Sequence, residues 1–178
     1  MNNIILIGFM GCGKSTVGIR LSYRLRRIVE DTDKLIEKKA DKSISDIFKE
    51  EGEPCFREME TECLRELLNS KDEKILATGG GLPMRRENHA LLKQLGCVLY
   101  LRISPEYVYE RLKNDTSRPL LQCEDPLERI RSLLAERAPI YEEAADIIVD
   151  VDGKDMEQII TEIVQKLKEY GYIQEDAI

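Results

Sequence analysis

Residues 8–15 read Gly-Phe-Met-Gly-Cys-Gly-Lys-Ser, directly after the apolar run 4–7 and directly before a helix-like segment. A glycine-rich turn between a strand and a helix lets backbone N–H groups converge on phosphate oxygens, and the helix N-terminus adds its dipole. Here Lys14 would contact the outer phosphates, and the Ser15 hydroxyl would ligate a bridging magnesium ion. The other residues expected at the phosphates are Gly11, Cys12, Gly13 and Thr16. The motif predicts a nucleoside triphosphate site, in preference to a turn that only connects two elements.

The rest of the chain alternates apolar, strand-like runs with amphipathic, helix-like runs. This alternation is typical of a parallel sheet covered by helices on both faces, so we predict an α/β fold. The expected strands span residues 3–7, 28–31, 74–77, 97–103 and 146–151. Long helices are expected over about 54–69, 125–142 and 155–170, and residues 173–178 are expected to fray.

Length and charge narrow the class of protein. A chain of 178 residues fits a single domain, 1–178, with a core of its own. The net charge of −7, from 27 basic and 34 acidic residues, argues against a nucleic-acid binder. No run approaches the ~20 apolar residues of a membrane span, and no signal peptide precedes the first strand. The five scattered cysteines suggest neither a zinc site nor disulfides. We therefore expect a cytoplasmic protein whose partners are small molecules.

Two further motifs fall where predicted strands end. Asp31 and Asp33 follow the second strand, and Gly79, Gly80 and Gly81 follow the third. Parallel α/β sheets gather their ligand sites at the carboxyl ends of the strands. One acid could hold magnesium and the other a substrate hydroxyl, although a plain helix N-cap is an alternative. The three glycines would expose backbone N–H groups to a ligand, although a bare turn is also open.

Three arginines point to an acidic substrate. A guanidinium binds carboxylate or phosphate with two hydrogen bonds, which suits Arg57, Arg118 and Arg137, although a single surface arginine is usually only solvated. Glu60 lies one helical turn after Arg57 and could hold it in position. Arg118 lies in residues 113–125, a polar stretch interrupted by proline that we interpret as a mobile lid.

Six motifs, in this order along the chain, resemble those of shikimate kinases. They are GFMGCGKSTVG at 8–18, DTD at 31–33, SISDIF at 43–48, FREME at 56–60, ATGGG at 77–81 and RPLL at 118–121. The match runs from about residue 3 to residue 152. Each motif alone is weak evidence for a substrate, but gluconate kinases and nucleoside monophosphate kinases share only the first, so the set is specific.

The resemblance implies transfer of the γ-phosphoryl group of ATP to the 3-hydroxyl of shikimate, in the route to chorismate and the aromatic amino acids. It also implies a P-loop fold like that of nucleoside monophosphate kinases, with strand order 2-3-1-4-5. On the ATP side it implies that Lys14 contacts the β- and γ-phosphates, and that Ser15 binds Mg²⁺ directly while Asp31 contacts the ion indirectly. It also implies that Arg111 packs along the adenine and that Arg118 reaches the phosphates.

On the acceptor side, the resemblance implies a shikimate-binding region within residues 31–62. Asp33 would orient or deprotonate the attacking hydroxyl, and Arg57 and Arg137 would hold the carboxylate. The backbone of the glycine triplet, Gly79, Gly80 and Gly81, would line the same site. The expected partners are ATP and shikimate, with no nucleic acid or membrane, and the chain is expected to be a monomer.

The sequence departs from the family pattern in two places. Residues 26–30 read Arg-Arg-Ile-Val-Glu, where family members usually have a link with Gly and Phe, and this blurs the start of the second strand. Lys154 stands where the family often has an arginine at the adenine rim. Two other functions are alternatives: a kinase for another polyol acid, such as gluconate, or for a nucleoside monophosphate, and a non-catalytic nucleotide-binding regulatory module. The arginine pair distinguishes the protein from the first alternative. A regulatory module would keep the phosphate loop but would not need Asp33, the glycine triplet and Arg118 together.

Overall fold

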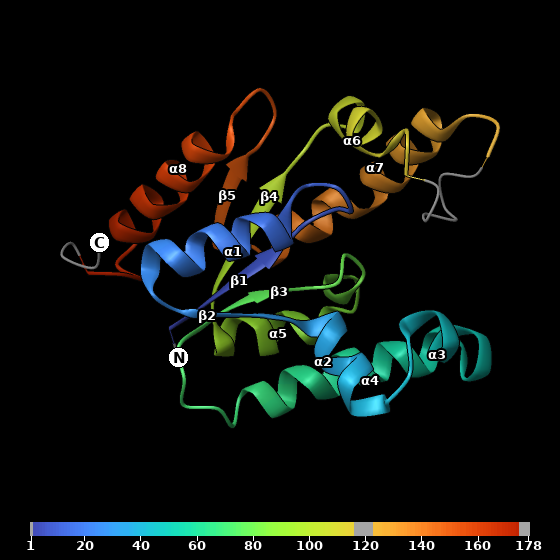
Figure 1. Ribbon diagram of the computed structural model, residues 1–178, viewed down its shortest axis with the longest axis horizontal. Helices are drawn as coiled ribbons and strands as arrows, with labels where there is room; N and C mark the ends of the chain where they lie inside the picture. Colours follow the sequence, from blue (N-terminus) through green and yellow to red (C-terminus); the bar gives the residue numbers. More distant parts are fainter. Residues whose placement is uncertain (1, 116–122, 175–178) are drawn as a thin grey trace.

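The computed structural model describes residues 2–115 and 123–174, and Figure 1 shows a central sheet covered by helices. The strands are β1 (Asn3–Ile7), β2 (Ile28–Asp31), β3 (Lys74–Ala77), β4 (Gly96–Arg102) and β5 (Ile147–Asp150). They pair in parallel in the order β2-β3-β1-β4-β5. The predicted α/β fold and strand order are confirmed, and every predicted strand lies within one residue of an observed one.

Helices cover both faces of this sheet. They are α1 (Lys14–Leu25), α2 (Thr32–Ala40), α3 (Ile44–Glu50), α4 (Gly52–Leu67), α5 (Arg86–Leu95), α6 (Pro105–Leu112), α7 (Pro126–Ala144) and α8 (Met156–Glu169), with a 3₁₀ turn η1 (Leu82–Met84). In Figure 1, α1 and α8 lie together over one face, and α5 and α7 lie behind the other. The helices α2, α3 and α4 form a group beside the β2 edge.

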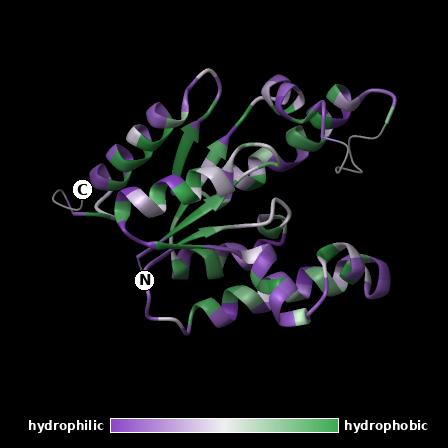
Figure 2. Ribbon diagram, in the orientation of Figure 1, coloured by the Kyte–Doolittle hydropathy of each residue, from purple (hydrophilic) through white to green (hydrophobic). Residues whose placement is uncertain are grey.

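The core is centred on β1, whose pattern of consecutive apolar residues suits a strand buried on both faces. All five of its residues are buried, and Figure 2 shows hydrophobic residues along the strands and on the inward sides of the helices. The one polar member, Asn3, is satisfied because its side chain donates to the Leu95 carbonyl at 2.9 Å and accepts from the Lys74 N–H at 2.8 Å. Such pairing removes the penalty of burying an amide.

Side-chain caps set several helix boundaries. Asp31 caps α2, Ser43 caps α3 and Asp125 caps α7. Asp155 and Gln158 form a reciprocal capping box at the start of α8. Each cap satisfies N–H groups that the first helical turn leaves without a partner. The predicted long helices therefore begin where expected, except that α4 starts at Gly52, two residues before the predicted Pro54.

None of the helices in the described part of the chain is long and apolar enough to cross a membrane.

The geometry that matters for function lies at the carboxyl ends of β1, β2 and β3. These three strands are adjacent, so the segments that follow them, residues 8–15, 31–34 and 78–81, meet at one edge of the sheet.

Candidate active site

The loop between β1 and α1 has the conformation of an anion cradle. Gly8, Gly11 and Gly13 all have positive φ angles, of 144°, 75° and 99°, which residues with a side chain rarely adopt. Gly13 is the N-cap of α1 and provides no side-chain cap. The first N–H groups of α1 are therefore free to donate to a ligand.

Lys14 folds back over this loop. Its Nζ donates to the Gly8 carbonyl at 2.7 Å and to the Phe9 carbonyl at 3.0 Å. Cys12 is almost fully buried beneath it, with 1% of its surface exposed, so it is a packing residue of the loop. Arg111, from α6, donates to the Gly11 carbonyl at 3.0 Å and thus lies at the rim of the cradle.

Lys154 forms an ion pair with Glu162 of α8. This contact supplies no evidence for its predicted position at the adenine. Arg118 and the central part of the predicted lid, residues 116–122, lie outside the described residues.

Asp31 and Asp33 lie on either side of the junction between β2 and α2. The strand ends at Asp31 and α2 begins at Thr32. Oδ1 of Asp31 accepts from the N–H groups of Asp33 at 3.0 Å and Lys34 at 3.4 Å, so Asp31 does act as the helix N-cap. Asp33 stands in the first turn of α2, and its Oδ1 is buried without a hydrogen bond in the part of the chain that the structure describes.

Burial, and after it the charges of Asp31 and Glu37, raise the pKa of Asp33, which stands at about 6 with all its neighbours included. Lys14 and Arg57 act in the opposite direction and lower this pKa. Both cations are therefore close enough to Asp33 to act on its charge. One is the lysine of the phosphate loop and the other comes from α4, so the charge of Asp33 is coupled to both groups of predicted site residues.

Two glycines of the triplet, Gly79 and Gly81, leave room for charged side chains that pack against them. A Cβ atom on Gly79 would stand 2.5 Å from Oδ1 of Asp33 and 3.1 Å from Oε1 of Glu60. A Cβ atom on Gly81 would overlap the guanidinium of Arg57. The triplet therefore does more than turn the chain, because its missing side chains make room for the charged groups of the site.

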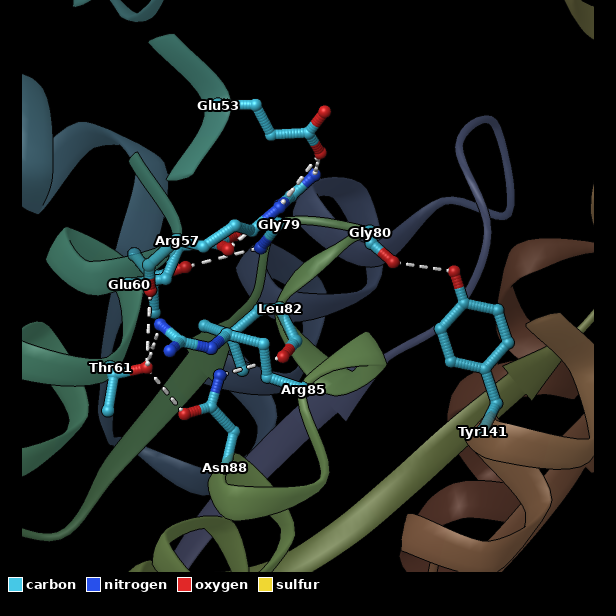
Figure 3. Close-up of polar contacts among 11 residues, drawn as sticks. Glu53, Arg57, Glu60, Thr61, Gly79, Gly80, Leu82, Arg85, Asn88 and Tyr141 are labelled. Atoms are coloured by element: carbon cyan, nitrogen blue, oxygen red, sulfur yellow. Dashed lines mark hydrogen bonds and ion pairs between the residues drawn. The ribbon is translucent and has the colours of Figure 1, made fainter. Parts of the chain in front are cut away.

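Arg57 projects from α4 and is held by two carboxylates, as Figure 3 shows. Its Nη1 donates to Glu60 at 2.8 Å, and its Nε and Nη2 donate to Glu53 at 3.1 and 2.8 Å. The predicted contact with Glu60 is confirmed. The contact with Glu53 was missed, although its position four residues before Arg57 carries the same helical signal.

Glu60 is fully buried, which sequence reasoning did not anticipate. Burial raises the pKa of Glu60 and the hydrogen bond from Arg57 lowers it, and the net result is a pKa of about 7. Its Oε1 has no hydrogen-bond partner in the described part of the molecule. A buried acid with an unsatisfied oxygen is unfavourable for stability and is typical of functional sites.

A chain of buried hydrogen bonds fixes α4 against the turn that follows the triplet (Figure 3). Thr61 of α4 donates to the Asn88 side chain at 2.9 Å, and Asn88 donates to the Leu82 carbonyl at 2.8 Å. Thr61 and Asn88 are both fully buried. The glycine triplet and Arg57 therefore keep a fixed relative position.

Helix α7 contributes from the other side of the triplet. The guanidinium of Arg137 lies 5.7 Å from the centre of the Phe9 ring, a residue of the phosphate loop. Tyr141 donates from its hydroxyl to the Gly80 carbonyl at 2.6 Å, as Figure 3 shows. Tyr141 was not predicted, and the only signal for it is its position one helical turn after Arg137.

Comparison with known proteins agrees with this geometry. The family model described as shikimate kinase matches residues 10–168. A shikimate kinase of Thermodesulfovibrio yellowstonii is 44% identical over 93% of this chain and 95% of its own length. The structure titled shikimate kinase from Acinetobacter baumannii in complex with shikimate is 40% identical, with a TM-score of 0.86 over 95% of this chain and 94% of that one.

A second solved structure, shikimate kinase from Aquifex aeolicus, is 38% identical with a TM-score of 0.82, covering 94% of this chain and 97% of that one. The family model and these relatives span nearly the whole chain. This chain belongs to the shikimate kinase family.

Proposed function

We propose that this protein transfers the γ-phosphoryl group of ATP to the 3-hydroxyl of shikimate, giving shikimate 3-phosphate and ADP, in the route to chorismate and the aromatic amino acids. The observation that carries the proposal is the arrangement of Asp33 and Glu60 against Gly79, with Arg57 bound to Glu60 and the charge of Lys14 acting on Asp33. A hydroxyl bound at Asp33 would face the phosphate donor on one side and a carboxylate-binding arginine on the other.

The ATP half consists of the loop backbone with Lys14 and Arg111. Phosphoryl transfer requires mainly alignment and charge neutralisation, which uncapped helix N–H groups and a lysine supply. Lys14 would exchange its two carbonyl partners, Gly8 and Phe9, for phosphate oxygens. Arg111 at the rim is suited to pack along the adenine. The phosphate contact of Arg118 and the adenine contact of Lys154 stay predictions.

The residues of the loop and of β2 fit a magnesium ion. The Ser15 hydroxyl is exposed, and Asp31 uses Oδ1 for its helix cap while Oδ2 has no hydrogen bond in the described part of the chain. Hard oxygen ligands of this kind are those that Mg²⁺ prefers. Ser15 would therefore hold the ion directly and Asp31 through water. When bound, Mg²⁺ neutralises charge on the β- and γ-phosphates.

The acceptor half consists of Asp33, the glycine triplet and two arginines. Arg57 and Arg137 would hold the shikimate carboxylate, since a guanidinium binds a carboxylate with two hydrogen bonds. Arg57 is already oriented by Glu53 and Glu60. Asp33 would accept a hydrogen bond from the attacking hydroxyl, and a pKa of about 6 leaves it ionised and able to do so at neutral pH.

The predicted lid within residues 113–125 would close over both substrates and exclude water, because otherwise ATP would be hydrolysed. The monomeric state and the cytoplasmic location stay predictions as well.

The test is a coupled assay of ADP release with ATP and Mg²⁺. We expect shikimate to stimulate ADP release strongly and gluconate to leave it at the level of buffer. Stimulation by gluconate and none by shikimate would reject the substrate assignment. Tight ATP binding without turnover of any hydroxylated acid would favour a nucleotide-binding regulatory module.

A further inference from the structure

A second cavity lies between α2 and α4, outside the proposed active site. Its volume is about 830 Å³, within the range of sites that bind small molecules. The two helices run side by side in Figure 1, and Lys74 at the start of β3 and Glu30 of β2 also line the cavity. Among the described residues, its lining includes none of Asp33, Arg57 and Glu60.

The walls of this α2–α4 cavity are mainly apolar. They include Leu35, Ile36 and Ala40 from α2, and Met59, Cys63 and Leu67 from α4. Side chains of this kind bind rings through apolar burial, while a few polar groups set the orientation of a ligand. The size and the walls favour a molecule with at least one ring.

The charges around the cavity favour an anion. Its four acids are all engaged in ion pairs: Glu30 with Lys74, Glu58 with Arg85, Glu62 with Arg65, and Glu66 with Lys39. Among the lining residues, Lys38 is left as a cation for which the described structure gives no ion pair. The lining residues carry four acids and four cations, so their formal charges cancel, and Lys38 is the lining cation whose charge no ion pair of the described residues neutralises. A single negative charge on the ligand would complement Lys38.

The cavity and the active site share two helices. On α4, Arg57 and Glu60 face the glycine triplet, while Met59 and Cys63 line the cavity. On α2, Asp33 faces the triplet and Leu35 lines the cavity. Packed helices move as units, so a ligand that separates α2 from α4 would shift Asp33 relative to Arg57.

We propose that the α2–α4 cavity binds a small molecule with an apolar ring and one negative charge, and that its occupancy changes the affinity for shikimate. The effect on shikimate affinity rests on the proposed function, whereas the binding of the small molecule does not.

The binding test uses 8-anilinonaphthalene-1-sulfonate, an aromatic monoanion that fluoresces in apolar sites, titrated into the intact protein. We expect saturable binding that excess ATP and shikimate do not abolish. Met59→Trp should fill the cavity and remove this binding. Lys38→Glu should weaken it about tenfold through charge reversal. Lys49→Glu on α3 makes the same charge change away from the cavity and should leave binding unchanged. N-phenyl-1-naphthylamine, which lacks the sulfonate, should bind the original protein and Lys38→Glu equally.

Displacement of the dye by ATP, or equal dye binding by the original protein, Met59→Trp and Lys38→Glu, would overturn the site. Circular dichroism of each variant checks folding, and the exposed Lys38 keeps the test valid if Met59→Trp fails to fold. The coupling test measures the KM for shikimate with the dye at saturation, where we expect a change of about fivefold. An unchanged KM would overturn the coupling alone. A protein that binds the dye but never phosphorylates shikimate would contradict the proposed function and leave the site supported.

Discussion

The ATP half and the acceptor half of the site are stabilised in opposite ways. In the ATP half, Lys14 is satisfied by two carbonyls of its own loop, Gly8 and Phe9. In the acceptor half, Asp33 and Glu60 each bury an oxygen that has no hydrogen bond in the described structure. Burial raises the pKa of these two acids to about 6 and about 7.

This difference follows from how each half is made. The phosphate loop is one continuous segment, so its geometry can be optimised locally by glycines with positive φ. The acceptor half joins residues from α2, α4, α7 and the turn after β3, and it leaves hydrogen-bonding capacity open for a polar substrate. Removing charge should therefore have opposite effects on stability in the two halves.

The largest expected effect is that of Asp33→Asn. Activity should fall by about 10²- to 10⁴-fold, since the amide cannot act as the anionic acceptor for the hydroxyl. The free energy of unfolding at pH 7 should rise by about 1–3 kcal/mol, because a buried charge of raised pKa is removed. Kinetics and urea unfolding measure the two quantities.

Lys14→Met is the matched control in the ATP half. It should lose about 10²- to 10³-fold in activity, as for other electrostatic stabilisers. Its stability should fall by about 1 kcal/mol, since two carbonyls lose their partner. Equal stability changes in the two variants would mean that the halves do not differ as argued.

The next largest effect is that of Arg57→Ala. The KM for shikimate should rise about 10²-fold, because a charged pair with the carboxylate is lost, while the KM for ATP should stay nearly constant. Stability should also fall by about 3 kcal/mol, because Glu60 is left buried without its cation.

The double variant Arg57→Ala/Glu60→Gln separates the two roles of Arg57. It should recover most of the stability but none of the shikimate affinity. If the two KM values rise equally in Arg57→Ala, the carboxylate role of this arginine is wrong.

Much of this was predictable from the sequence because its signals are local. The strand order followed from the family resemblance, and the strand positions followed from apolar runs such as Asn3–Ile7. The contact from Arg57 to Glu60 followed from helical spacing. The burial of Glu60 and the hydrogen bond from the Tyr141 hydroxyl to Gly80 could not be predicted. Both depend on α4 and α7 packing against the turn that follows β3, far away in the sequence.

A change of pH should have an effect of intermediate size on the free energy of unfolding of the protein without substrates. The folded pKa values of Asp33 and Glu60, about 6 and about 7, exceed the ordinary values of 3.8 and 4.5. At pH values between the ordinary and the folded pKa of each acid, the folded protein retains a proton that the unfolded chain has lost. The free energy of unfolding should therefore fall as pH rises from about 5 to 7.5, by about 1–3 kcal/mol.

Urea unfolding across this range, compared with Asp33→Asn/Glu60→Gln, isolates the contribution of the two acids. The double variant should show a much flatter profile. Exposed acids whose pKa is lowered by ion pairs, such as Glu58 and Asp150, titrate below this window. A parallel loss of stability in the double variant would contradict the assignment to the acceptor half.

The smallest expected effect concerns Tyr141, which joins α7 to the glycine triplet. Tyr141→Phe keeps the ring but leaves the Gly80 carbonyl without the donor that now stands at 2.6 Å. Stability should fall by about 1–2 kcal/mol, and the KM for shikimate should rise about threefold because Gly79 and Gly81 lose their fixed position. The KM for ATP should not change.

Tyr100 provides the matched control, because its ring stacks on Tyr141 with centroids 5.1 Å apart. The Tyr100 hydroxyl is buried without a hydrogen bond in the described structure. Tyr100→Phe removes an unsatisfied polar atom, so stability should stay constant or rise, with both KM values unchanged. The two variants make the same chemical change at neighbouring rings, so a difference in KM between them measures the hydrogen bond to Gly80 alone. Equal effects would show that Tyr141 acts only through its ring, and the acceptor half would then depend on α7 for packing and for Arg137 but not for the position of its glycines.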